Sequence, residues 1–215
     1  MFVNHINNYF LILFSLIPLS IIIGSSVSLI NIILIDVSFL ILLFYQKDFS
    51  FFKNNYFQYL LIFYIYLIFN SLISVDKMIG ISRNIGFIRI IILFLAINYF
   101  FKDEKFLKKV LFSWISIFSV VLIDVYLESF TGENILGYGS LYGRRIVSFF
   151  KDEPIVGGYI NAFYLILIGF LYNKFTTQHK NKILLLSIFF LFAIFLTGER
   201  SNAIKAFLGI IFFYA

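Results

Sequence analysis

The stretch GRRIVSFFKDEPIVGGYI, residues 143–160, gathers charge in a chain that is otherwise poor in it. Apolar runs of the kind that sit in lipid precede and follow it. Charged residues make up 13% of the chain and hydrophobic residues 61%, with a mean hydropathy of +0.98. A soluble domain carries roughly 25% charged residues. The composition therefore predicts an integral membrane protein.

The apolar runs recur with lengths near the roughly 20 residues that a helix needs to cross a bilayer. Backbone polar groups in lipid must be satisfied within the segment, so continuous apolar runs predict helices, whereas a β-barrel would alternate. We expect an all-α fold, a polytopic transmembrane helix bundle that forms a single transmembrane domain over residues 1–215. Its eight expected spans cover residues 9–23, 27–45, 56–73, 85–101, 110–126, 154–172, 183–197 and 202–215.

The sequence is still apolar where it ends at Ala215, which predicts a chain incomplete at its C-terminus, the front portion of a longer enzyme. It contains no Cys, no Walker loop, no zinc motif and no dinucleotide fingerprint. We therefore expect no cofactor and no metal site. The sequence indicates no oligomeric state.

Cytoplasmic loops of membrane proteins carry more Lys and Arg than the loops on the other side, so the number of these residues in alternate loops predicts the orientation of the chain. One set of loops holds only lysines and is expected to be cytoplasmic: Lys47, Lys53, Lys102, Lys105, Lys108, Lys109, Lys174, Lys180 and Lys182. The other set holds Lys77, Arg83, Arg144, Arg145, Lys151 and Arg200. This division predicts a cytoplasmic N-terminus and one long outer loop, residues 127–153. It also explains the net charge of +6 without a nucleic-acid partner.

Arginine follows the same division. Every Arg is assigned to the outer loops or to the outer end of a span: Arg83, Arg89, Arg144, Arg145 and Arg200. Orientation requires only charge, whereas the planar guanidinium also grips phosphate or carboxylate in bidentate fashion. The distribution predicts recognition of an anion on the outer side. Chance in so small a set is the alternative.

Four charged residues fall inside the expected spans: Asp36, Arg89, Asp124 and Lys205. For Lys205, in the first turn of the eighth span, we expect a side chain that snorkels to the interface. Arg89 is predicted about one turn inside the outer end of the fourth span, and Asp124 in the last outer turn of the fifth. Arg89 and Asp124 could form either a buried structural ion pair or a pair that lines a substrate cleft, and the sequence leaves both interpretations open. Asp36 is nearer the midplane, where a functional role competes with a protonated carboxyl that is hydrogen-bonded between helices.

Helix capping is the competing interpretation of the polar residues near the outer turns. Asp152 and Glu153 precede Pro154, and acids at that place stabilise the positive end of a helix. Gly198 is suited to close one helix and Ser201 to cap the next.

Capping does not account for Arg144, Arg145 or Arg200. An Arg at a helix N-terminus opposes the helix dipole. Its presence at the start of the eighth span therefore predicts an anionic partner, either Glu199 or a ligand.

These residues resemble a known family, the bacterial O-antigen polymerase and O-antigen ligase group of polytopic membrane glycosyltransferases. RRIVSFFKDEPIVGGY, residues 144–159, resembles the outer-loop pattern of that group. TGERSN, residues 197–202, is similar to a second pattern at the following outer turn, and SRNIGFIRIIILF, residues 82–94, to its Arg-bearing span. The resemblance extends from about residue 56 to the end of the chain.

The resemblance implies glycan transfer in lipopolysaccharide biosynthesis, at the outer face of the bacterial inner membrane. The sugar chains would be carried on undecaprenyl pyrophosphate, and the partners would be this lipid-linked glycan and the bilayer. Arginines would hold the pyrophosphate as negative charge develops on it, and an acid would remove the proton of the acceptor hydroxyl. The implied clamp is Arg144, Arg145 and Arg200 with Arg89 as an addition; the implied base is Glu153 or Glu199, with Asp152 and Asp124 as secondary candidates.

Two non-enzymatic functions are the alternatives. An Arg-lined outer cleft would also suit a transporter or flippase for an anionic polysaccharide or lipid, and a structural membrane subunit is the third reading. A transporter is expected to show repeated halves and spans broken near the midplane. The sequence indicates neither feature.

Overall fold

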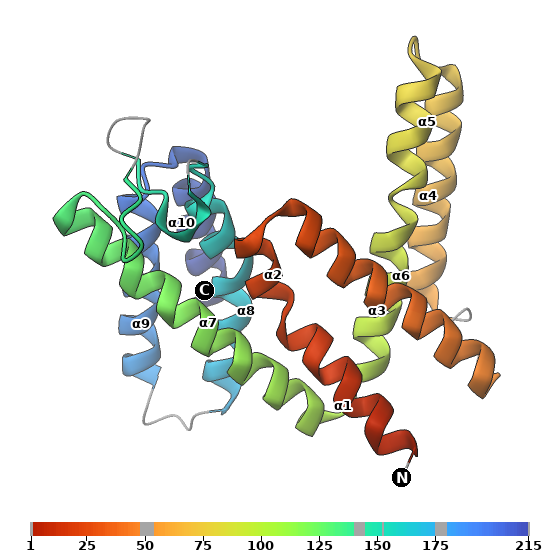
Figure 1. The fold of residues 1–215 in the computed structure, drawn as a ribbon, viewed down its shortest axis with the longest axis horizontal. Helices are drawn as coiled ribbons and strands as arrows, with labels where there is room; N and C mark the ends of the chain where they lie inside the picture. Colours follow the sequence, from red (N-terminus) through yellow and green to blue (C-terminus); the bar gives the residue numbers. More distant parts are fainter. Residues whose placement is uncertain (1, 48–53, 140–144, 152, 175–179, 215) are drawn as a thin grey trace. The chain divides into compact units, whose positions relative to one another are not determined.

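In the computed structural model, the secondary structure of the described part of the chain is entirely helical (Figure 1). The described residues are 2–47, 54–139, 145–151, 153–174 and 180–214. The α-helices are α1 (Phe2–Ser15), α2 (Ile17–Ile23), α3 (Ser25–Gln46), α4 (Asn55–Ile73), α5 (Lys77–Ile85), α6 (Ile88–Phe100), α7 (Glu104–Thr131), α8 (Val156–Lys174), α9 (Lys180–Leu196) and α10 (Arg200–Tyr214). A short 3-10 helix, η2, covers Ser148–Phe150. The predicted all-helical class is confirmed.

Five helical segments are long and apolar enough to cross a membrane: α3, α4, the combined stretch Lys77–Phe100, α7 and α8. Helices α1 and α2 pass the same test together, but their axes differ by 43°. Helix α9 is apolar yet has 17 residues, which is about 26 Å of helix. A hydrocarbon core is about 30 Å thick. Eight spans and their orientation remain predictions.

Helices extend beyond two of the expected spans, over residues 77–84 and 127–131. Residues 74–84 lie between the third and fourth expected spans, and most of them belong to helix α5. After a break at residues 86–87 the chain continues into α6. Arg89 therefore lies midway along Lys77–Phe100 rather than near one end. Helix α7 continues to Thr131, so Asp124 lies about two turns before its end. Polar side chains do not end a helix by themselves, whereas Gly132 with φ of 84° does end α7.

The chain divides into two compact units. Unit 1 comprises Met1–Ser20 and Ser25–Val110, and unit 2 comprises Ile21–Gly24 and Leu111–Ala215. Aromatic rings fill the core of unit 1 around Phe100. Its ring centroid lies 4.3 Å from that of Phe10, 5.2 Å from that of Phe106 and 6.3 Å from that of Phe39. Such pairs stabilise by roughly 0.5–1.5 kcal/mol each beyond burial, and they join α1, α3, α6 and the start of α7.

In unit 2, helices α8, α9 and α10 pack pairwise against one another (Figure 1). Phe118 of α7 packs against Tyr159 of α8 and Phe190 of α9. Helices α8 and α10 approach closely at Gly209, where an added Cβ would lie 2.7 Å from the Leu165 side chain. This packing holds the N-terminal ends of α8 and α10 next to each other.

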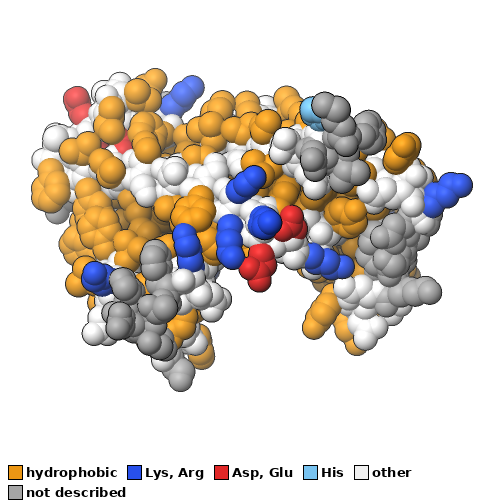
Figure 2. All heavy atoms as spheres, turned by 90° about the horizontal axis from the view of Figure 1, so that it is seen from below, with side chains coloured by type: hydrophobic (Ala, Val, Ile, Leu, Met, Phe, Trp, Pro, Cys, Tyr) orange, Lys and Arg blue, Asp and Glu red, His pale blue; other side chains and the backbone are white. Residues whose placement is uncertain are grey.

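Hydrophobic side chains cover much of the face shown in Figure 2, and the charged ones appear there in small groups. Exposed apolar side chains also follow helix α4, where Ile62, Ile65 and Phe69 are 63%, 59% and 58% exposed. Contiguous apolar surface of this kind is rare on soluble monomers. It agrees with helices that face lipid.

Candidate functional site

The turn between α9 and α10 is built around Gly198 and Glu199. Gly198 has φ of 76°, a conformation that favours glycine, and it closes α9 as the sequence predicts. The Glu199 carbonyl accepts the first hydrogen bond of α10, from the Ala203 N–H at 3.0 Å. Glu199 therefore occupies the N-cap position. The predicted cap, Ser201, lies inside the helix, because the turn at Gly198 already separates the two helices.

The Glu199 carboxylate binds the start of α8. Its Oε1 accepts the Gly157 N–H at 2.6 Å, and its Oε2 accepts the Asn202 side-chain amide at 2.5 Å. The first N–H groups of a helix have no partner within it and carry partial positive charge. The cap of α8 thus comes from a residue 42 positions away. The sequence assigned it to Asp152, which lies outside the described residues, and to Glu153, whose side chain is exposed.

A hollow of about 540 Å³ opens beside this cap, and we call it the outer hollow because the sequence predicts that these helix ends face outward. Sites for small ligands have volumes of roughly 300–1,000 Å³. Its lining residues come from the long loop, the start of α8 and the α9–α10 turn: Arg145, Pro154, Gly198, Glu199, Arg200 and Ser201. The structure thus brings together two arginines of the predicted clamp and one of the two predicted bases.

Both arginines of the outer hollow are exposed. The Arg145 stem packs over the turn, since a Cβ added to Gly198 would lie 3.6 Å from Arg145 Cγ. Arg200 is the first residue of α10. Among the described residues, neither guanidinium forms an ion pair with an acid. With the positive N-terminal ends of α8 and α10 nearby, the outer hollow favours an anion.

Glu128 holds the return of the long loop against α7. Its two carboxylate oxygens accept the backbone N–H groups of Val147 at 2.9 Å and Ser148 at 2.6 Å. Glu128 is 4% exposed. Val147 and Ser148 are two and three residues after Arg145, so these hydrogen bonds fix the position of the backbone that carries Arg145.

Asp124 and Asn134 complete this anchor. The Asp124 carboxylate is fully buried and accepts the Ile135 N–H at 2.8 Å and the Ser148 hydroxyl. The Asn134 amide donates to the Ser148 carbonyl. We call Asp124, Glu128 and Asn134 the loop anchor. Asp124 and Glu128 are four residues apart on α7, a spacing that places two acids on one helix face; this signal was present in the sequence and was missed for Glu128.

Of the other predicted residues, the structure describes Asp124, Glu153 and Arg89, and none of these is among the residues that line the outer hollow. Arg144 and Asp152 lie outside the described residues. Glu153 directly precedes Pro154, which does line the hollow. Arg89 belongs to unit 1, so its addition to the clamp stays a prediction.

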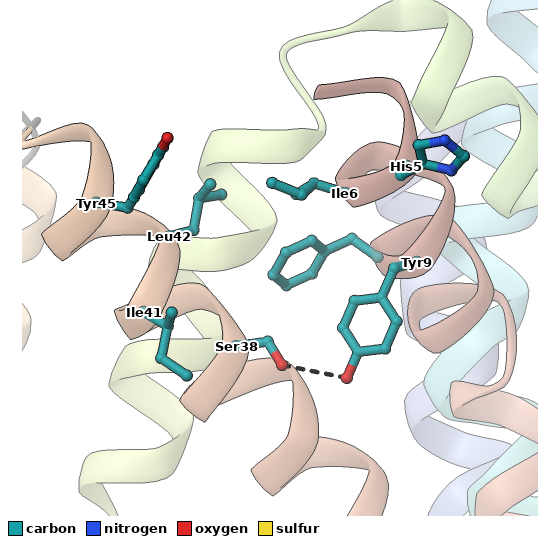
Figure 3. Close-up of a pocket in the computed structure, with 8 residues that line it drawn as sticks. His5, Ile6, Tyr9, Ser38, Ile41, Leu42 and Tyr45 are labelled. Atoms are coloured by element: carbon teal, nitrogen blue, oxygen red, sulfur yellow. Dashed lines mark hydrogen bonds between the residues drawn. The ribbon is translucent and has the colours of Figure 1, made fainter. Parts of the chain in front are cut away.

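A second hollow, in unit 1, is apolar. It has a volume of about 400 Å³ and lies between α1 and α3 (Figure 3). Tyr9 and Ser38 are hydrogen-bonded across it at 3.2 Å, and His5 lines it. Its described lining residues include no Arg, Lys, Asp or Glu, so they offer no counterpart to the arginines and the carboxylate of the outer hollow.

Replacing Gly157 by Ala is expected to destabilise unit 2. The added Cβ would lie 2.6 Å from Thr197 Oγ1 and 3.0 Å from the Glu199 carboxylate, and overpacking of this kind costs roughly 1–3 kcal/mol. Gly169→Ala on the same helix is the matched control, because its Cβ would meet only Phe213 at 3.8 Å. Thermal unfolding in detergent should show a lower Tm for G157A alone. Equal Tm values for the two variants would contradict the close approach of Glu199 to α8.

No protein-family model, no curated protein and no solved structure matches this chain. The function of the outer hollow is therefore inferred from its residues. These offer two guanidinium groups that form no ion pair within the described part of the chain, one carboxylate that caps α8, and two helix N-termini.

Proposed function

We propose that the outer hollow binds the diphosphate of a lipid-linked glycan. The chain would then be a polytopic membrane glycosyltransferase of the O-antigen polymerase or ligase kind. It would act on undecaprenyl-pyrophosphate-linked glycan at the outer face of the bacterial inner membrane. The observation that supports this is the meeting of Arg145 and Arg200 in one hollow, without an acidic partner among the described residues.

The chemistry of transfer suits this arrangement. The acceptor hydroxyl oxygen attacks the anomeric carbon, the bond from that carbon to the diphosphate oxygen breaks, and the diphosphate leaves with the bonding electrons. Arg145 and Arg200 would stabilise the charge that accumulates on the leaving group. Two guanidinium forks can each bind phosphate oxygens in bidentate fashion.

An acid must take the proton that the acceptor hydroxyl loses. Glu199 lines the outer hollow, and each of its oxygens accepts one hydrogen bond, which leaves a further lone pair on each. Glu153 is exposed beside Pro154 and is the other candidate base. Glu199 is favoured because it lies in the hollow itself.

Binding of farnesyl diphosphate, a short prenyl diphosphate, tests the proposal without requiring turnover. Arg145→Gln and Arg200→Gln are each expected to weaken binding at least about tenfold, since a hydrogen bond to a charged group contributes roughly 1.5–3 kcal/mol. Isothermal titration of the purified chain in detergent measures the affinity. Lys205→Gln is the control, because Lys205 is exposed on α10 and does not line the hollow. Equal affinity in wild type and both Arg variants would refute the assignment.

Transport of an anionic lipid or glycan is the second candidate, and broken helices favour it. The sequence indicated no spans broken near the midplane, whereas the structure contains a bent helix pair. Helices α1 and α2 form a pair bent by 43°, and the stretch Lys77–Phe100 is interrupted at residues 86–87. Pro18 explains the first bend, because it lacks an N–H and its ring clashes with the preceding turn. The second coincides with Gly86, a poor helix former.

Reconstituted vesicles distinguish the two candidates. A transporter would move a fluorescent prenyl diphosphate across the bilayer in the absence of any acceptor sugar. A transferase would lengthen or transfer the glycan and leave the lipid carrier on its original side.

A further inference from the structure

One carboxyl group in unit 1 has no role in the site described above. Asp36 is the twelfth of the 22 residues of α3, so it lies at mid-length. Its side chain is 4% exposed. Both carboxylate oxygens are buried, and neither has a hydrogen-bond partner in the part of the chain that the structure describes. The interhelical hydrogen bond that the sequence left open is therefore not formed there.

Such a carboxyl cannot simply remain charged. An isolated ionised carboxylate in an apolar interior is costly, and it either becomes neutral or is paired. Ionisable residues within spans are rare and mark proton or ion pathways or ligand sites. Asp36 must therefore be neutralised by a proton or by a nearby cation.

Arg89 is the nearby cation. Helices α3 and α6 pack together, and the charge of Arg89 acts on the Asp36 carboxyl. The two side chains nevertheless form no ion pair. Arg89 Nε instead donates to the Gly86 carbonyl at 3.0 Å, and a Cβ on Gly86 would lie 3.2 Å from Arg89 Nη2. The guanidinium is thus folded back onto the break between α5 and α6.

The other titratable side chains on the helices packed against α3 are engaged elsewhere. Tyr99 of α6 donates to Gln46 at 2.8 Å, at the end of α3. Tyr9 of α1 is bonded to Ser38, and His5 lines the apolar hollow of Figure 3. Among the described residues of α1 and α6, this leaves Arg89 as the charged group that bears on Asp36.

We propose that Asp36 is a proton-binding site within the membrane and that Arg89 is drawn to it when the proton leaves. A proton from water adds to one carboxylate oxygen, and the net charge of Asp36 and Arg89 together changes from zero to +1. Loss of the proton restores the negative charge and attracts the guanidinium away from Gly86. The proton would thereby control the attachment of α6 to α3 next to the helix break. This site is independent of the outer hollow, and it requires only that α3 crosses a bilayer.

Dicyclohexylcarbodiimide tests the proposal, because it adds covalently to protonated carboxyl groups in apolar surroundings. The full chain in liposomes is treated over a pH series, and the Asp36 peptide is analysed by mass spectrometry. We expect an adduct at Asp36 that declines as the pH rises, and none at this position in Asp36→Asn. Arg89→Gln should increase the adduct several-fold at a given pH, because a nearby cation favours the charged form. Arg83→Gln, an exposed cation of α5, should leave it unchanged.

A permanent ion pair predicts the opposite pattern. Asp36 would then gain no adduct while the chain is folded. Asp36→Asn and Arg89→Gln would each lower the Tm, and the double variant would restore it. That pattern, or an adduct independent of pH in the wild type, would overturn the proposal. The wild-type series decides even if a variant misfolds.

Discussion

Arg145→Lys and Arg200→Lys are each expected to lower glycan transfer by about 10²–10³-fold, the loss typical of removing one preorganised donor at a transition state. Lysine keeps the charge but lacks the planar fork that binds two phosphate oxygens at once. Both arginines are exposed at the outer hollow, so neither replacement disturbs the core. The chain should insert into the membrane at normal levels.

The measurement is the length distribution of glycan chains in cells in which the variant is the sole copy, with the amount of protein in the membrane fraction determined in parallel. Lys205→Arg serves as the control for a conservative change of cation on α10. The double variant R145K/R200K should lose less than the product of the single losses, because residues that act together on one group are not additive. Normal glycan chains in both single variants would remove the basis for the clamp.

Glu128→Ala is expected to release the long loop from α7. It would leave the buried N–H groups of Val147 and Ser148 without their acceptor, at about 1–3 kcal/mol for each group. Hydrogen exchange of these two amides should become roughly 30-fold faster or more, the factor that corresponds to about 2 kcal/mol. In Glu128→Gln the exchange rate of the two amides should lie between those of the wild type and Glu128→Ala, because the glutamine amide offers only one acceptor oxygen.

Glu133→Ala is the matched control, since Glu133 is an exposed acid in the same loop. Its exchange at Val147 and Ser148 should equal that of the wild type. Because the released loop carries Arg145, E128A should also weaken farnesyl diphosphate binding. Unchanged protection of both amides in E128A would show that the loop does not depend on the anchor.

The helical class and the positions of the apolar helices were predictable from the sequence. Continuous apolar runs leave the backbone no other way to satisfy its hydrogen bonds in lipid, and every run that was expected to span contains a helix. The end of α9 was also predictable, because Gly198 can adopt the positive φ that closes a helix. Helix α5 and the last turns of α7 fall outside the expected spans, because the spans were drawn from apolar runs and these segments are more polar.

The candidate site was predictable only in part. Arg145, Arg200 and Glu199 were chosen because charge is scarce in this chain and therefore informative where it gathers. Their meeting in one hollow depends on the packing of α8 against α10, which no local pattern reports. For Glu128 the spacing of four residues from Asp124 was a local signal, but it did not show what Glu128 binds, since its partners lie 19 and 20 residues further along the chain.

The sequence by itself determined that this is a helical chain with spans suited to lipid and a cluster of arginines around two turns, because hydropathy and charge are local properties. Only the tertiary structure decided that Glu199 caps α8, that Glu128 holds the loop of Arg145, and that Asp36 lies buried without a hydrogen-bond partner among the described residues. Each of these depends on which side chains distant elements bring into contact. That is settled by the packing of whole helices.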